Sequence, residues 1–218
     1  MNLRKLIFGF LGYLGVVLLL NTCGQPQAKL DETATPTATI FTTNTTLLPA
    51  GLLYKGDYIN IRSPNSDGWT LQDSSTAGMV FAKSGAEPNE TFAAQVGMFP
   101  LAPTNNKEEF VSLIQQGADS DTDNERFDII ESEFNYSEER SYPCVEASAI
   151  LEDKQAWTSS TTQEVLLLQM KSLFCRHPVR DDTGFAIIYS HRGESLYPNL
   201  NAEAQAFFNG VQVPGYDQ

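Results

Sequence analysis

The first 23 residues contain basic residues, then an apolar run, then a cysteine. This order is the feature that most limits which part of the chain can fold into a domain. Arg4 and Lys5 precede the apolar run 6–20 (LIFGFLGYLGVVLLL), and Cys23 follows it. The run is shorter than the roughly 20 apolar residues that a membrane-spanning helix needs. It is typical of the apolar region of an export signal. We therefore expect residues 1–22 to act as a signal and the domain to fold after export.

This pattern resembles the signal of a bacterial lipoprotein, in which a peptidase cuts before the cysteine and acyl chains are attached to it. The resemblance implies that residues 1–22 are a lipoprotein-type signal peptide and that Cys23 becomes the lipidated N-terminus. It also implies a membrane-anchored position in the bacterial cell envelope, facing the periplasm or the exterior. An uncleaved anchor and ordinary secretion are the alternatives.

The composition is strongly acidic, and this charge restricts the partners that we expect. The 218 residues carry a formal net charge of −13. Loss of Arg4 and Lys5 with the signal would take the charge to about −15. An acidic surface repels nucleic acid and anionic lipid. We therefore expect no nucleic acid partner, contact with the membrane through the N-terminal lipid, and an envelope protein as the partner.

The remaining chain divides into a tether and one domain. Residues 23–50 are rich in threonine, include Pro36 and Pro49, and show no hydrophobic period. Such a polar segment buries too little apolar surface to fold, so we expect a lipidated, disordered tether. Residues 51–218 have the length of a single globular domain.

Hydrophobic spacing within residues 51–218 indicates the type of fold. Asn105 is positioned to cap a helix over 105–116 that Gly117 ends, and Asn201 is positioned to cap a closing helix. Period-two patterns and apolar runs predict strands over 53–61, 69–72, 78–83, 91–99, 127–136, 144–151, 164–175 and 184–190. This order predicts an α+β domain, with an antiparallel sheet and helices packed against it.

One short region resembles the start of PsbP/Mog1-type domains. These domains begin with a strand, a turn that contains proline, and a "dGW" element. The corresponding residues are Ile59 to Pro64 (INIRSP) and Asp67-Gly68-Trp69. The resemblance implies the α+β fold of envelope and photosystem accessory lipoproteins, and it carries no shared catalytic site.

The two cysteines that remain after Cys23 predict a disulfide. Cys144 begins one expected strand and Cys175 ends the next, and an exported protein oxidises such a pair. If they face each other in an antiparallel hairpin, Ala149 faces Met170 and the turn falls in the polar Thr/Ser stretch near residue 160. Facing residues of such a pair lie within disulfide range. The alternative is a zinc site that combines both cysteines with His177 and His191.

An acidic stretch supplies the second chemical candidate. Asp119, Asp121 and Asp123 have the spacing of the first calcium ligands of an EF-hand loop, but Asn124 and Ile130 replace the glycine and the glutamate that the motif needs. Residues 119–140 hold nine acids against Arg126 and Arg140. The interpretations are a solvated surface, a docking face for a basic partner, or a weak metal site at 119–125.

The lack of recognisable catalytic motifs in the sequence favours a binding protein over an enzyme. The chain has two histidines, no G-x-S-x-G nucleophile turn and no phosphate-binding glycine loop. We therefore predict a non-catalytic, lipid-anchored binding or assembly module without a cofactor. The alternatives are an envelope hydrolase with carboxylates such as Asp67 or Glu146, and a calcium-stabilised module that uses residues 119–125.

Overall fold

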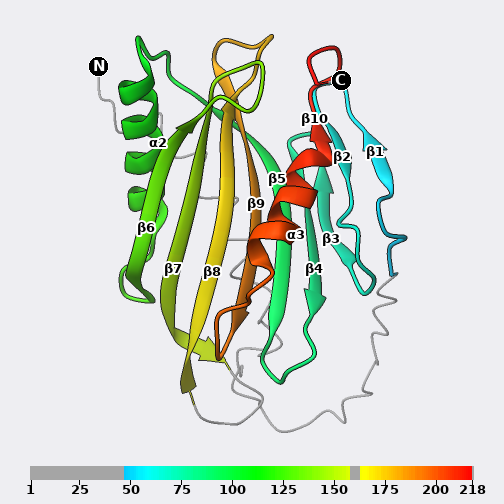
Figure 1. The fold of residues 1–218 in the computed structure, drawn as a ribbon, viewed down its shortest axis with the longest axis vertical. Coiled ribbons are helices and arrows are strands. Elements are labelled where there is room, and N and C mark those ends of the chain that lie inside the picture. The colour runs from blue at the N-terminus through cyan, green and yellow to red at the C-terminus, as the bar shows by residue number, and fades with distance from the viewer. Residues whose placement is uncertain (1–46, 158–162, 218) are drawn as a thin grey trace, which may run out of the picture.

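The computed structural model describes residues 47–157 and 163–217. The predicted signal segment, Cys23 and the predicted tether up to residue 46 lie outside this range, as does the predicted hairpin turn near residue 160. Within it the elements are β1 (Leu53–Lys55), β2 (Asn60–Arg62), β3 (Thr70–Ser75), β4 (Gly78–Ser84), β5 (Thr91–Pro100), α2 (Lys107–Asp121), β6 (Phe127–Ser137), β7 (Cys144–Trp157), β8 (Gln163–Arg176), β9 (Thr183–Gly193), α3 (Leu200–Asn209) and β10 (Val211–Gln212) (Figure 1).

A seven-stranded antiparallel sheet organises the domain. Its strand order is β3-β4-β5-β9-β8-β7-β6, and a small sheet with the order β1-β2-β10 lies apart from it. Both edge strands of the large sheet are irregular, with a register shift between Leu71 and Asp73 in β3 and another between Ile129 and Glu131 in β6. The predicted α+β class, an antiparallel sheet with helices packed against it, is confirmed.

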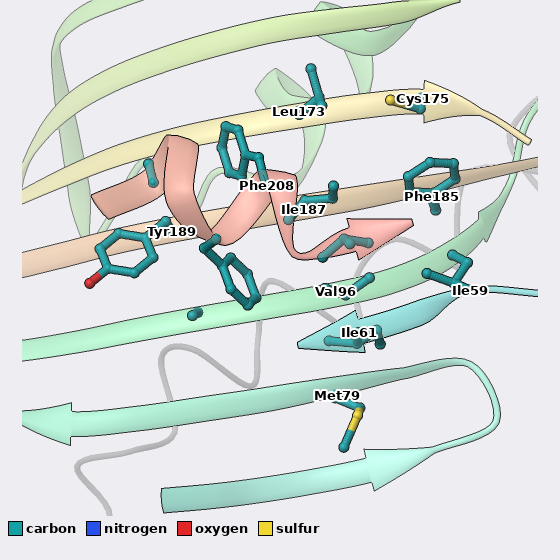
Figure 2. Packing of buried hydrophobic residues seen from close by; sticks show 14 of the residues in the cluster. Ile59, Ile61, Met79, Val96, Leu173, Cys175, Phe185, Ile187, Tyr189 and Phe208 are labelled. Carbon is teal, nitrogen blue, oxygen red and sulfur yellow. The ribbon is translucent and has the colours of Figure 1, made fainter. Parts of the chain in front are cut away.

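The two faces of the large sheet carry separate cores. Side chains alternate along β9, so Phe185 and Ile187 pack on the face that α3 and the small sheet cover, while Ala186 and Ile188 pack on the other face. On the first face Phe208 of α3 lies among buried residues of both sheets (Figure 2). On the second face, Phe110 of α2 packs against residues of β7, β8 and β9. Each helix is therefore fixed by its own apolar stripe.

The disulfide and its register agree with the sequence prediction. Cys144 and Cys175 form a disulfide and pair directly across β7 and β8, with their Cα atoms 4.1 Å apart. Ala149 faces Met170 in the same ladder, as the register predicted. The zinc alternative is wrong for these residues because both sulfurs are bonded to each other. His177 is also occupied, since the backbone N–H of Val179 donates to its Nδ1 at 3.2 Å.

Helix ends were predicted less accurately than helix positions. Asn106, and not Asn105, caps α2, because its Oδ1 accepts from the backbone N–H of Glu109 at 2.7 Å. Gly117 does not end the helix, which continues to Asp121. A glycine inside a helix costs only about 1 kcal/mol, so Gly117 alone does not end α2. In α3 the N-cap is Asn199, so the predicted cap Asn201 lies inside the first turn.

The strand predicted over 53–61 is a hairpin of two short strands. β1 ends at Lys55, and β2 returns beside it from Asn60. Gly56 begins the connection where a Cβ atom would lie 2.7 Å from the carbonyl oxygen of Ile59, so only glycine fits without a shift of the backbone. This close approach turns the chain inside an apparently alternating segment.

The last residues of the predicted tether contact the domain. Leu47 forms an antiparallel bridge with Thr70, and the N–H of Leu48 donates to the carbonyl of Trp69 at 2.9 Å. Leu48 also packs against the core under α3. The described domain therefore begins at about the end of the threonine-rich segment, before residue 51.

Candidate functional site

One part of the large sheet carries no covering element among the described residues. Helix α3 packs on β8 and β9, and α2 packs on the opposite face of β6 and β7. Figure 1 shows β6 and β7 beside α3 with no helix in front of them. On β7, residues that alternate with Cys144 share its side of the sheet, so Glu146, Ser148, Ile150 and Glu152 point to this uncovered side.

The register brings acidic residues of β6 onto the same side. Asp128 pairs with Glu152, Glu131 with Ile150, and Glu133 with Ser148. We name this surface the acidic sheet face and define it by Asp128, Glu131, Glu133, Glu146 and Glu152. The three residues of β6 are exposed, and the two of β7 are half-buried.

The charges of the acidic sheet face are only partly balanced. Lys154 pairs with Asp128 at 2.8 Å, and Lys171 lies opposite Ser148. Asp128 and Glu152 stand directly opposite each other, and like charges in that position destabilise a sheet. The excess of carboxylates is therefore a feature that stability alone does not favour.

The acidic stretch predicted at 119–140 is divided by the fold. Its two basic residues are used internally, because Arg126 pairs with the buried Asp153 and Arg140 pairs with Asp217. Glu138 pairs with Lys107 of α2. Of the remaining acids, four lie at or just after the end of α2 (Asp119, Asp121, Asp123 and Glu125), three lie on β6 (Asp128, Glu131 and Glu133), and Glu139 follows β6. The acidic stretch does not include Glu146 and Glu152, the two residues that β7 adds to the acidic sheet face. The sequence still held a signal for them, because the predicted Cys144–Cys175 register and the alternation of side chains place both residues on the same side of the sheet.

A pocket of about 290 Å³ lies at one end of the acidic sheet face, between β7, β8 and the end of α3. Leu173 and Phe208 are buried residues of its lining, and Glu139 and Glu146 bring carboxylates to it. The rest of the lining consists of Arg140, Gln205, Asn209, Val211, Gln212 and Asp217.

Arg140 holds the C-terminal segment against this pocket. Its guanidinium donates to the hydroxyl of Tyr142 at 2.8 Å, to Asp217 at 3.1 Å, and to the carbonyl oxygens of Val211 at 2.9 Å and Phe208 at 2.6 Å. Tyr142 donates in turn to Asp217 at 2.6 Å. Burial, together with that hydrogen bond to Asp217, raises the pKa of the Tyr142 phenol. This network has a structural role and uses the carboxylate of Asp217. Among the described residues, the other two carboxylates that line the pocket, those of Glu139 and Glu146, are in no ion pair.

A second polar cluster lies beneath the first turns of α3. Glu203 accepts hydrogen bonds from the hydroxyls of Tyr197, at 2.6 Å, and Tyr189, and Lys83 lies 4.0 Å away. Burial and the Glu203 carboxylate raise the pKa of Tyr189. Because these donors surround the carboxylate, Glu203 is placed to fix α3 on the sheet rather than to move a proton.

The two histidines also have structural partners. His191 is buried, and its Nε2 lies 3.0 Å from Glu90. Burial lowers the pKa of His191, although Glu90 opposes the shift. The neighbouring Ser190 points to the other side of the sheet, toward the carbonyl of Ala93 at 3.5 Å. The adjacent serine and histidine therefore do not form a nucleophile and base pair.

The EF-hand-like segment does not form a loop. Asp119 and Asp121 lie in the last turn of α2, and Asp123 accepts from the backbone N–H of Glu125 at 3.0 Å. Burial raises the pKa of the Asp121 carboxyl group to about 6. Over 47–157 and 163–217, no group of three or more His, Cys, Asp or Glu residues is placed to hold a metal ion. The weak calcium candidates Asp119, Asp121 and Asp123 are therefore not arranged as an EF-hand loop.

The two carboxylates named for the hydrolase alternative, Asp67 and Glu146, do not lie together in the fold. Asp67 precedes β3 at one edge of the large sheet, while Glu146 lies on β7, and four strands separate β3 from β7. The larger pocket of the domain, about 540 Å³, lies elsewhere, between the β1–β2 hairpin and the β3–β4 hairpin. It is lined mainly by apolar residues such as Leu71, Met79 and Met98.

None of the helices in the described ranges combines the length and apolar character needed to cross a membrane.

Comparison with known proteins gives a fold likeness at low identity. No family model and no curated protein sequence matches the chain. The Ran-binding protein Mog1p of Saccharomyces cerevisiae is similar in structure, with 8% sequence identity and a TM-score of 0.42, over 78% of this chain and 95% of that one. A point mutant of the protein Mog1 is similar with 9% identity and a TM-score of 0.41, over 78% of this chain and 96% of that one.

Proposed function

We propose that this protein is a lipid-anchored accessory module of the bacterial cell envelope that acts by binding and not by catalysis. The acidic sheet face is its docking surface, and the partner is a basic segment of another envelope protein. The observation that carries this proposal is the collection of five carboxylates on an uncovered part of the sheet. The resemblance of residues 58–98 to PsbP/Mog1-type accessory domains remains a hypothesis beside it.

Charge complementarity selects the type of partner. Asp128 and Glu152 face each other across β6 and β7, and only Asp128 has a cationic partner, Lys154. A cationic segment that lies over the acidic sheet face would therefore balance carboxylates that repel each other in the free protein. The same charges repel nucleic acid and anionic lipid. A basic peptide segment is therefore the ligand whose chemistry matches the surface.

The polar clusters support a binding role over catalysis. Glu203 is surrounded by donors, and the two cysteines are joined to each other. Ser190 and His191 point to opposite sides of the sheet. The proposal therefore assigns no catalytic residue.

Lipid attachment at Cys23 is the first expected result. Because the basic start, apolar run and cysteine form a lipoprotein-like signal, protein purified from membranes should begin at Cys23 and carry acyl chains. Intact mass and N-terminal sequencing measure both properties. A Cys23→Ser protein should lack the acyl chains, and its intact mass should therefore differ from that of the parent. If it partitions with membranes at the mass of the parent, the lipid anchor is refuted.

Binding of a basic peptide is the second expected result. A fluorescent peptide of eleven lysines should bind the full-length protein in non-ionic detergent, and rising salt should weaken the complex. Replacing Glu131, Glu133 and Glu152 by Gln should weaken binding roughly tenfold, since each exposed ion pair contributes up to about 1 kcal/mol. Fluorescence anisotropy gives the dissociation constants.

A charge-matched variant separates local docking from net charge. Asp67→Asn, Asp73→Asn and Glu87→Gln remove three exposed charges near the opposite edge of the sheet. This triple variant should bind the lysine peptide within about twofold of the parent, because the charges removed lie beyond the screening length from the docking surface. Equal losses in both triple variants would show diffuse attraction and would overturn the assigned surface.

A further inference from the structure

The pocket at the end of the acidic sheet face has the chemistry of a side-chain recognition site. We propose that it receives one arginine side chain of the basic partner. This inference rests on the proposed function, because it assumes a basic segment on the acidic sheet face. It adds a specificity that overall charge cannot supply, namely a preference for arginine over lysine at one position.

The position of the pocket connects it to that surface. Glu146 belongs to both, as the first β7 residue of the acidic sheet face and as part of the pocket lining. A peptide laid along β6 and β7 therefore reaches the pocket without leaving the surface. The volume of about 290 Å³ suits a single long side chain rather than a large ligand.

The lining matches both parts of an arginine side chain. Leu173 and Phe208 supply an apolar wall for the methylene stem, and an aromatic face also attracts a guanidinium. Glu139 and Glu146 supply two carboxylates, which a guanidinium binds better than an ammonium because its N–H donors form a planar fork.

The rim offers further acceptors for a group with five N–H donors. Gln205 and Asn209 of α3 and Gln212 of β10 also line the pocket with side-chain amides, and the Nε2 of Gln205 donates to the Oδ1 of Asn209 at 3.4 Å. The wall residue Arg140 does not cancel the negative charge of the pocket, because Asp217 pairs with it at 3.1 Å and carbonyl oxygens take its other donors. The pocket thus keeps the charge of Glu139 and Glu146.

Two peptides of equal charge test the inference. One has eleven lysines, and the other has arginine at its central position. The full-length protein in non-ionic detergent should bind the arginine peptide about five times more tightly than the lysine peptide. In Glu146→Gln this ratio should fall to about one, since one of the two carboxylates that receive the fork is lost. Anisotropy titrations at one fixed salt concentration measure the ratio.

Two further variants assign the effect to the pocket. Gln205→Trp changes no charge and fills the pocket from an exposed position of α3, so it should also bring the ratio of the two affinities to about one. The variant with Gln in place of Glu131, Glu133 and Glu152 should bind both peptides more weakly. The ratio of its affinities for the arginine and lysine peptides should equal that of the parent.

The outcomes distinguish the two proposals. Equal affinity of the parent for both peptides overturns the arginine pocket and leaves the docking surface in place. A preference that survives both Glu146→Gln and Gln205→Trp overturns the pocket as its location. Failure of both peptides to bind overturns the docking surface and, with it, the pocket.

Discussion

Replacing Asp153 by Asn should lower the free energy of unfolding by about 3–5 kcal/mol, the range found when one partner of a buried ion pair is removed. Asp153 is fully buried and accepts from the Nε of Arg126 at 2.8 Å and from an Nη atom at 2.6 Å. Arg192 is also buried and lies 3.5 Å away. Burial lowers the pKa of Arg192, and Asp153 opposes that shift. Loss of the carboxylate would leave buried cationic charge without its counterion.

Urea denaturation of parent and variant measures this loss. The matched control is Asp128→Asn, which removes the partner of Lys154 from an exposed pair between β6 and β7. That change should alter stability by less than about 1 kcal/mol. A loss below 1 kcal/mol for Asp153→Asn as well would mean that the buried arginines find other compensation, contrary to the network described here.

Replacing Cys144 and Cys175 together by Ala should cost about 2–4 kcal/mol. The disulfide joins residues 31 positions apart, so it removes a large part of the conformational freedom of this segment in the unfolded chain. Both sulfurs are also buried in the core beneath α3. Urea denaturation measures the contribution of the disulfide in two independent ways, by comparing the parent with the double variant and by comparing the parent with and without reductant.

Reductant provides the control for the disulfide. It should destabilise the parent by about the same amount as the double substitution and leave the double variant unchanged. If reductant has no effect on the unfolding of the parent, although free thiols appear, the disulfide does not contribute to stability as proposed.

Local patterns predicted the parts of the fold in which neighbours along the chain determine the structure. The β7–β8 pairing was predictable because alternation and two cysteines fixed a single register. The end of α2 was not, because a glycine inside a helix costs only about 1 kcal/mol and does not by itself mark the end of the helix. The hairpin at Gly56 was also missed, since the need for glycine arises from a close contact with Ile59 that no period reveals.

The candidate site shows the same division. The acids of 119–140 were visible in the sequence, but whether each is paired depends on distant residues such as Asp153 and Asp217. The pocket combines β7, β8, α3 and the C-terminal segment. Its residues are separated by up to about half of the described domain, so only the folded chain brings them together.

The irregular edge strands have a consequence for how copies of the protein behave beside one another. A regular outer strand presents free N–H and C=O groups that another sheet can extend, which leads to aggregation. Here the two outer strands, β3 and β6, each contain a register shift. Such a bulge bends the strand and interrupts its row of hydrogen-bonding groups. The sheet therefore resists growth from either end, so that crowded copies stay separate while their faces remain open to contact.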